Sequence, residues 1–244
     1  MEKVAIIVET REHKALPFVL NNVMSVLPDD WKLQIFHGSE NIDYIKNIIK
    51  DTDYFDRTKL DNLHIDSITA DESSLEIMLT EDFWERVIGE TVLYFECDSM
   101  LCPNSEYKVE DFEHFDYIGG WWGKFFDPNS VDESYDRVMN GGISIRKKSF
   151  MLDIIKNELK PYLKRGGNPC EDYFVTDRIR NKPTVKDVLN FSIDNGYMYP
   201  LDRKAPFGLH KPWGEVKSKG HGRYYKLIKK ACPEVEELER LNGL

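Results

Sequence analysis

The chain has 244 residues and a formal net charge of −10, with 41% hydrophobic residues. The negative charge disfavours a nucleic-acid-binding protein, because such binding depends on neutralising phosphates. There is no apolar run of the roughly 18 residues that a membrane-spanning helix needs. The N-terminus, MEKVAIIVETRE, is too short and too acidic for a secretory signal, so we expect a cytoplasmic protein without a membrane span.

The first half of the chain alternates between strand and helix patterns. Short apolar runs rich in β-branched and aromatic residues predict strands, and apolar residues at helical spacing predict helices. The predicted strands are Val4–Val8, Lys32–Phe36 and Thr91–Phe95, and the predicted helices are Leu16–Leu27, Ile42–Ile49 and Ser73–Arg86. This alternation is typical of an α/β fold with a mostly parallel central sheet flanked by helices.

The second half is less regular and predicts a smaller, mixed region. Its elements, in chain order, are a strand at Tyr117–Trp122, a polar loop at Phe125–Asp136, a turn and strand at Asn140–Arg146, helices at Lys148–Leu159 and Glu171–Arg180, and short C-terminal helices at Tyr224–Ala231 and Val235–Leu241. No linker composition separates the two halves. We therefore expect residues 1–244 to form a single domain.

Two carboxylates follow the most apolar predicted strand. Glu96 and Asp98 come directly after Thr91–Phe95, and in extended backbone they would share a face. Ligands of parallel α/β sheets gather at the carboxyl ends of strands, where Glu9, Thr10 and Arg11 also lie. A hard divalent cation, Mg²⁺ or Mn²⁺, would bind both acids and could hold a diphosphate. The alternative is an ordinary surface loop.

Two glycine pairs stand next to predicted strands. The segment NGG places Gly141 and Gly142 at the head of a strand, where backbone can approach a ligand closely. The segment YIGGWW places two tryptophans after Gly119 and Gly120, where aromatic rings could form a platform for a sugar. The alternative for the tryptophans is core packing.

Acids and a histidine complete the set of candidate residues. Glu171 and Asp172 begin a predicted helix, where the helix dipole favours carboxylates, so the alternative is an ordinary acidic first turn. His210 and Lys211 lie in the loop PFGLHKPW. A histidine together with carboxylates could coordinate a cation, and the alternative is a structural histidine.

In this order, the motifs resemble those of the GT-A glycosyltransferases. The set ETRE, FHGSEN, FWE, ECDSMLC, YIGGWW, NGGISIR, EDYF and PFGLHKPW is more closely similar to a largely uncharacterised glycosyltransferase-like family of bacterial, fungal and viral proteins. The resemblance extends from Val4 to Trp213. The sequence departs from the usual Asp-x-Asp metal motif, because Glu96 stands at its first position and Asp98 at its second.

The resemblance implies a role for each matching residue. Residues 1–100 would form the nucleotide-binding half, residues 101–222 the acceptor and catalytic half, and residues 223–244 the C-terminal helices. The cation, Mn²⁺ or Mg²⁺, would be bound by Asp98, Glu96 and His210. The nucleotide-sugar donor would be bound by Glu9, Thr10, Arg11, Glu96, Gly141, Gly142, Lys211 and Trp213. Asp172, or less favourably Glu171, would act as the base of an inverting reaction.

The predicted function is transfer of a sugar from a nucleoside-diphosphate sugar to a hydroxyl of a glycan, protein or small molecule, as in glycan biosynthesis. One alternative is a sugar nucleotidyltransferase, although such enzymes commonly carry a glycine-rich phosphate loop and the turn ETREHKALP has no glycine. The other is a non-catalytic nucleotide- or sugar-binding protein of the same fold. The sequence does not predict the base, the sugar, the acceptor or the oligomeric state.

Overall fold

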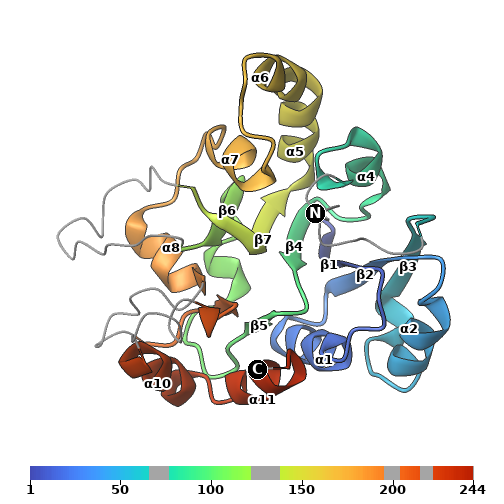
Figure 1. Ribbon diagram of the computed structural model, residues 1–244, viewed down its shortest axis with the longest axis vertical. Helices are drawn as coiled ribbons and strands as arrows, with labels where there is room; N and C mark the ends of the chain where they lie inside the picture. Colours follow the sequence, from blue (N-terminus) through green and yellow to red (C-terminus); the bar gives the residue numbers. More distant parts are fainter. Residues whose placement is uncertain (66–76, 122–137, 195–203, 215–221, 244) are drawn as a thin grey trace.

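A computed structural model describes residues 1–65, 77–121, 138–194, 204–214 and 222–243 (Figure 1). Its centre is a six-stranded sheet with the order β3-β2-β1-β4-β7-β6. The strands of this sheet are β1 (Lys3–Glu9), β2 (Trp31–His37), β3 (Thr58–Asn62), β4 (Thr91–Phe95), β6 (Tyr117–Gly120) and β7 (Asn140–Lys147). A second sheet has the order β5-β9-β8, with β5 (Ser99–Leu101), β8 (Ser192–Asp194) and β9 (Gly208–His210).

Helices flank the central sheet, and Figure 1 shows α1 and α2 on one side of it with α4 and α5 on the other. The α-helices are α1 (Leu16–Val26), α2 (Ile42–Ile49), α4 (Glu81–Arg86), α5 (Lys148–Ile154), α6 (Lys160–Lys164), α7 (Glu171–Thr176), α8 (Val185–Phe191), α10 (Gly222–Ala231) and α11 (Val235–Leu241). Short 3₁₀ turns lie at Phe55–Arg57 and Val109–Asp111, and a π-helical turn, Ile155–Leu159, joins α5 to α6. Among the described residues, every helix is too short or too polar to cross a bilayer.

The order and direction of the strands bring the candidate residues to one edge of the sheet. Strands β3, β2, β1 and β4 run parallel, so the carboxyl ends of β1 and β4 are neighbours. Strand β7 runs antiparallel to β4, which places its first residues beside the end of β4. All five residues of β4 are buried, as expected for a central strand whose two faces are both covered.

The candidate ligand His210 lies on the second sheet, at the end of β9. Strand β9 pairs antiparallel with β5, which follows β4 after a short turn, and parallel with β8. In this register Ser99 and Asp194 are both partners of His210. The small sheet therefore fixes His210 close to the segment that carries Glu96 and Asp98.

The predicted fold class is confirmed: the molecule is α/β with a mostly parallel central sheet, flanking helices and a mixed second half. The predicted helix Ser73–Arg86 is helical at residues 77–78 and over Glu81–Arg86, but it is interrupted before Thr80, whose side chain caps α4 by accepting the Phe83 N–H. The turn predicted within NGG is wrong, since Asn140 already belongs to β7. The predicted loop Phe125–Asp136 lies outside the described residues, as does Trp122.

Candidate active site

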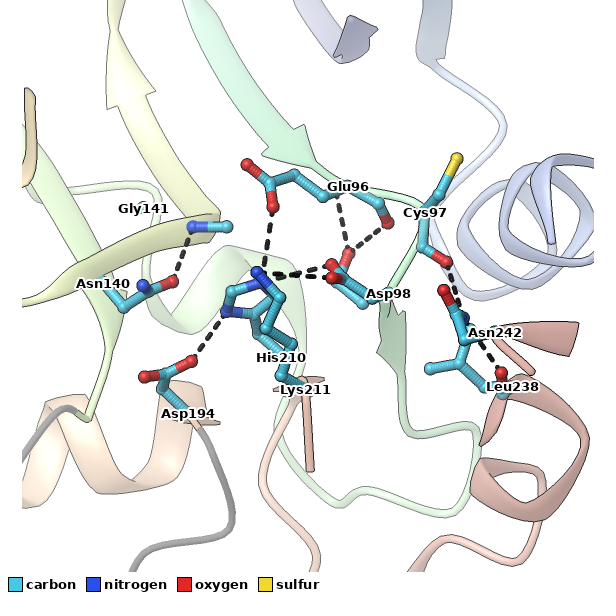
Figure 2. A network of polar contacts seen from close by, with 12 residues as sticks. Glu96, Cys97, Asp98, Asn140, Gly141, Asp194, His210, Lys211, Leu238 and Asn242 are labelled. Atoms are coloured by element: carbon cyan, nitrogen blue, oxygen red, sulfur yellow. Dashed lines mark hydrogen bonds and ion pairs between the residues drawn. The ribbon is translucent and has the colours of Figure 1, made fainter. Parts of the chain in front are cut away.

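Three side chains from two separate segments converge beyond the end of β4. Glu96 and Asp98 lie just after that strand, and His210 ends β9. His210 Nε2 is 3.3 Å from Glu96 Oε2 and 3.2 Å from Asp98 Oδ1 (Figure 2). Each of the three residues offers one ligand atom within 4.8 Å of the others. The structure thus brings together the three residues that the sequence predicts as cation ligands.

Glu96 and Asp98 point the same way, but not because they alternate along an extended strand as the sequence predicted. Strand β4 ends at Phe95, and a turn closes from Glu96 to Ser99. The Ser99 N–H donates to the Glu96 carbonyl at 3.1 Å, and Ser99 Oγ accepts from the Glu96 N–H at 3.0 Å. The turn, rather than the alternation of an extended strand, therefore directs both carboxylates toward His210.

The central polar atoms of this cluster lack the partners that buried polar atoms normally have. Asp98 Oδ1 and His210 Nε2 are buried, and neither makes a hydrogen bond to the described residues, although they lie close together. Buried polar atoms without a partner are rare in folded proteins. A divalent ion that takes oxygen and imidazole ligands would give both atoms a partner, so these residues fit such an ion.

The electrostatics of the cluster agree with this fit. Burial would raise the pKa of Asp98, but the charges of His210 and Lys211 hold it well below its usual range. Burial would lower the pKa of His210, but Asp98, Asp194 and Glu96 raise it well above its usual range. Three carboxylates surround one imidazole and leave an excess of negative charge, which a divalent cation would offset.

Lys211 follows His210 and faces the same acid. Its Nζ lies 3.4 Å from Asp98 Oδ2, and its backbone N–H donates to the Asp98 carbonyl at 3.0 Å. Its φ of 42° lies in the left-handed region, which costs free energy for a residue other than glycine. The chain therefore holds this lysine in an unfavourable backbone conformation next to the acid cluster.

The NGG glycines are packed against site residues of the chain itself. A Cβ added to Gly142 would lie 2.7 Å from His210 Cδ2 and closer still to Cε1 and Nε2. A Cβ added to Gly141 would lie 2.7 Å from Asp172 Oδ1, and the Gly141 N–H donates to that oxygen at 2.8 Å. Contact of these glycines with a donor sugar stays a prediction, and their shown role is to let Asp172 and His210 approach β7.

The adjacent acids Glu171 and Asp172 have different environments at the start of α7. Glu171 is fully buried and forms an ion pair with Arg146, which is also fully buried among Trp84, Tyr94 and Tyr117. Burial and the neighbouring Glu171 raise the pKa of Asp172 well above its usual range, and Glu96 adds to this rise. Of the two acids, Asp172 is therefore the one whose carboxylate is not committed to a buried cation.

A cavity of 340 Å³ opens beside the cation cluster, at the carboxyl ends of β1 and β4. Its volume is in the range of small-molecule sites, about 300–1,000 Å³. Within the described part of the chain its lining consists of Val8, Glu9, Arg11, His13, Glu96, Cys97, Asp98 and Asn242. The cation cluster thus shares a cavity with two of the residues predicted to bind the nucleotide.

Glu9 and Arg11 act as one unit in this wall. Glu9 Oε1 accepts from the Arg11 backbone N–H at 2.9 Å and from Nε at 2.8 Å, and Oε2 accepts from Nη2 at 2.8 Å. Burial would raise the pKa of Glu9, and these bonds lower it instead. Glu9, His13 and Cys97 also lie within 4.8 Å of one another, but Glu9 is already paired, so this second group is less suited to a cation.

Two predicted donor residues lie elsewhere, and several residues of the site were not predicted. Thr10 is buried and is not part of the described cavity lining, and Trp213 is buried with the hydrophobic core. Their roles in nucleotide binding stay predictions. The unpredicted residues are His13, Cys97, Arg146, Asp194 and Asn242. Asn242 comes from the end of α11 and donates from Nδ2 to the Cys97 carbonyl at 3.2 Å (Figure 2).

The sequence matches the model of one protein family. The family described as "Protein of unknown function (DUF5672)" matches residues 57–210, more than half of the chain. The chain belongs to this family. The matched segment of this DUF5672 protein contains Glu96, Asp98, Asp172 and His210. The resemblance to a bacterial, fungal and viral family stays a prediction, and no curated protein matches the sequence.

Comparison with solved structures identifies the fold of this DUF5672 protein. An active-site mutant of LgtC is 11% identical with a TM-score of 0.55, over 93% of this chain and 95% of LgtC. The apo form of the glycosyltransferase GlyE from Streptococcus pneumoniae TIGR4 is 11% identical with a TM-score of 0.52, over 86% of this chain. The match spans only 54% of the GlyE chain. The fold is that of the GT-A glycosyltransferases.

Proposed function

We propose that this protein is a glycosyltransferase that moves a sugar from a nucleoside-diphosphate sugar to an acceptor hydroxyl and depends on Mn²⁺ or Mg²⁺. The observation that carries the proposal is the cluster of Glu96, Asp98 and His210 at one end of a cavity in a GT-A fold. The cavity would hold the nucleoside diphosphate. The acceptor would be a glycan, a protein or a small molecule.

The charges around the cavity suit a diphosphate leaving group. Glu96, Asp98 and His210 would hold the cation, which when bound would stabilise negative charge on the diphosphate. Lys211 is next to Asp98 and would add a fixed positive charge where the leaving group develops its own. Arg11, oriented by Glu9, also lines the cavity and would contact the donor there.

Asp172 is the proposed base of an inverting reaction. The acceptor hydroxyl must lose a proton as it attacks, and a carboxylate with a raised pKa is a stronger base in its ionised form. The Gly141 N–H donates to one oxygen of Asp172 at 2.8 Å and so fixes the orientation of this carboxyl group. Glu171 is held by Arg146, so we assign it a supporting role rather than the alternative role of base.

Thermal unfolding with nucleotides tests the donor site. The purified protein would be heated with UDP, GDP, CDP or ADP, each with Mn²⁺ and with EDTA. A ligand at 100 times its Kd adds about 2.7 kcal/mol, which for a chain of this size shifts Tm by roughly 5–10 °C. We expect one nucleotide to produce this shift, and only with Mn²⁺.

The nucleotide that stabilises the protein then selects the donors for an assay of sugar transfer. Sugar conjugates of the stabilising nucleotide would be tested for release of the free nucleoside diphosphate with candidate acceptors, with Asp172→Asn as the matched variant. The variant should keep the nucleotide-dependent shift and lose transfer. A folded protein that no nucleotide stabilises would contradict the proposal, and release of pyrophosphate instead would indicate a nucleotidyltransferase.

A further inference from the structure

Asp194 is a fully buried carboxylate that the proposed reaction does not use. It is the last residue of β8. In the parallel pairing of β8 with β9, its register partner is His210. Register partners on adjacent strands have their side chains on the same face of a sheet. The pairing of β8 with β9 therefore places the Asp194 carboxylate beside the imidazole of His210.

The contact between them uses the ring nitrogen that faces away from the acid cluster. Asp194 Oδ1 lies 2.7 Å from His210 Nδ1, while Nε2 on the other side of the ring faces Glu96 and Asp98 (Figure 2). A carboxylate can only accept a hydrogen bond, so Nδ1 carries the hydrogen. The lone pair of a neutral ring is then on Nε2, the nitrogen that points at the proposed cation site.

We infer that Asp194 is a positioning residue for the cation site: it fixes the orientation and tautomer of His210 so that Nε2 can ligate a divalent ion. This inference rests on the proposed function, because it assumes that Glu96, Asp98 and His210 hold the ion. Carboxylates that hydrogen-bond the second nitrogen of a ligating histidine serve the same purpose in metal sites generally.

The backbone around Asp194 limits how far the pair can move. The Asp194 N–H donates to the Trp121 carbonyl at 3.2 Å, and the Trp121 N–H donates to the Ser192 carbonyl at 2.8 Å. A Cβ added to Gly120 would lie in ordinary van der Waals contact with the Asp194 Cβ, at 3.4 Å, so β6 and β8 already lie close together at this point. With Gly142 against its ring, His210 is confined between β7 and Asp194.

The test measures the affinity of Mn²⁺, by electron paramagnetic resonance titration, for the wild type, Asp194→Ala, His210→Ala and the double variant. We expect Asp194→Ala to weaken Mn²⁺ binding about 10–100-fold, the usual effect of removing such a partner. In the His210→Ala background the same substitution should change the affinity little, because Asp194 acts through His210. Ser192→Ala, on the same strand, is the matched control and should bind Mn²⁺ like the wild type.

Each outcome distinguishes this inference from the proposed function. Wild-type Mn²⁺ affinity in a folded Asp194→Ala protein would overturn the role of Asp194 and leave the cation site standing. The same conclusion would follow if Asp194→Ala reduced Mn²⁺ affinity by the same factor in the wild-type and His210→Ala backgrounds. If the wild type itself binds no Mn²⁺ with or without nucleotide, the proposed cation site fails and this inference with it. If Asp194→Ala does not fold, Asp194→Asn replaces it, with an expected loss of about tenfold and wild-type affinity as the contradicting result.

Discussion

Replacing Glu171 by Gln should destabilise the protein by about 3–5 kcal/mol, because it removes the carboxylate that forms the direct ion pair with the buried guanidinium of Arg146. Both side chains of this ion pair are 0% exposed. The aromatic faces of Trp84, Tyr94 and Tyr117 that surround Arg146 attract a cation but cannot neutralise it. The adjacent substitution Asp172→Asn should not have this effect, since the amide keeps the oxygen that accepts the Gly141 N–H.

Urea denaturation measures the difference between the two variants. With an m-value of about 1–3 kcal/mol/M, a loss of 3–5 kcal/mol moves the midpoint down by more than about 1 M. Asp172→Asn should unfold at or above the wild-type midpoint near neutral pH. Its native carboxyl has a raised pKa, so the wild type loses stability as pH rises from the ordinary aspartate pKa through the raised one, and the amide does not.

Two results would refute this reasoning. A Glu171→Gln protein with the wild-type midpoint would show that Arg146 finds another counter-charge or that water reaches it. An Asp172→Asn protein as unstable as Glu171→Gln would show that both acids support the fold, and Asp172 would then lose its assignment as a base. Mn²⁺ affinity should be unchanged in both folded variants, which separates this region from the cation cluster.

Three further predictions concern the cation site, the cavity wall and pH. Gly142→Ala should displace the His210 ring and weaken Mn²⁺ binding at least tenfold in a paramagnetic resonance titration; unchanged affinity would mean that the ring moves without losing its ligand role. Asn242→Ala should lower the free energy of unfolding by about 0.5–1.5 kcal/mol in urea denaturation, because it removes the hydrogen bond to the Cys97 carbonyl, and an unchanged midpoint would show that this bond does not hold the cavity wall. The transfer rate should rise with pH through the raised pKa of Asp172, since only the ionised carboxylate accepts a proton, and a rate already constant near the ordinary aspartate pKa would contradict this.

The central sheet was predictable because its main strands carry a strong local signal. Residues Val4–Val8 and Thr91–Phe95 are apolar runs, and both are strands in the structure. Strands β5, β8 and β9 were not predicted, since each has three residues and exists through pairing with a distant segment. Such short strands have no periodicity of their own, so the small sheet that positions His210 leaves no trace in local sequence.

The candidate site divides in the same way. Glu96 and Asp98 were predicted as cation ligands from their position after a buried strand, and the family resemblance added His210 to them. Arg146 had only a weak signal, because it ends the strand pattern ISIR and two further basic residues follow it, so its buried pairing with Glu171 was not predicted. Asp194 had no signal in the sequence, because an aspartate after Ser-Ile looks like any acid at the end of a strand. Only the pairing of β8 with β9 shows that it lies beside His210.

Glu96 shows how an unusual residue can fit a familiar position. The usual metal motif of the GT-A glycosyltransferases that the sequence resembles is Asp-x-Asp, whereas this chain has Glu96 at its first position, and a longer side chain would be expected to overreach. Here Tyr94, two residues earlier on β4, donates its hydroxyl to Glu96 Oε1 at 3.1 Å. The other oxygen, Oε2, is left 3.3 Å from His210 Nε2. The extra methylene thus lets one carboxylate reach both Tyr94 and the proposed cation site, so a glutamate at this position is compatible with the same ligand set.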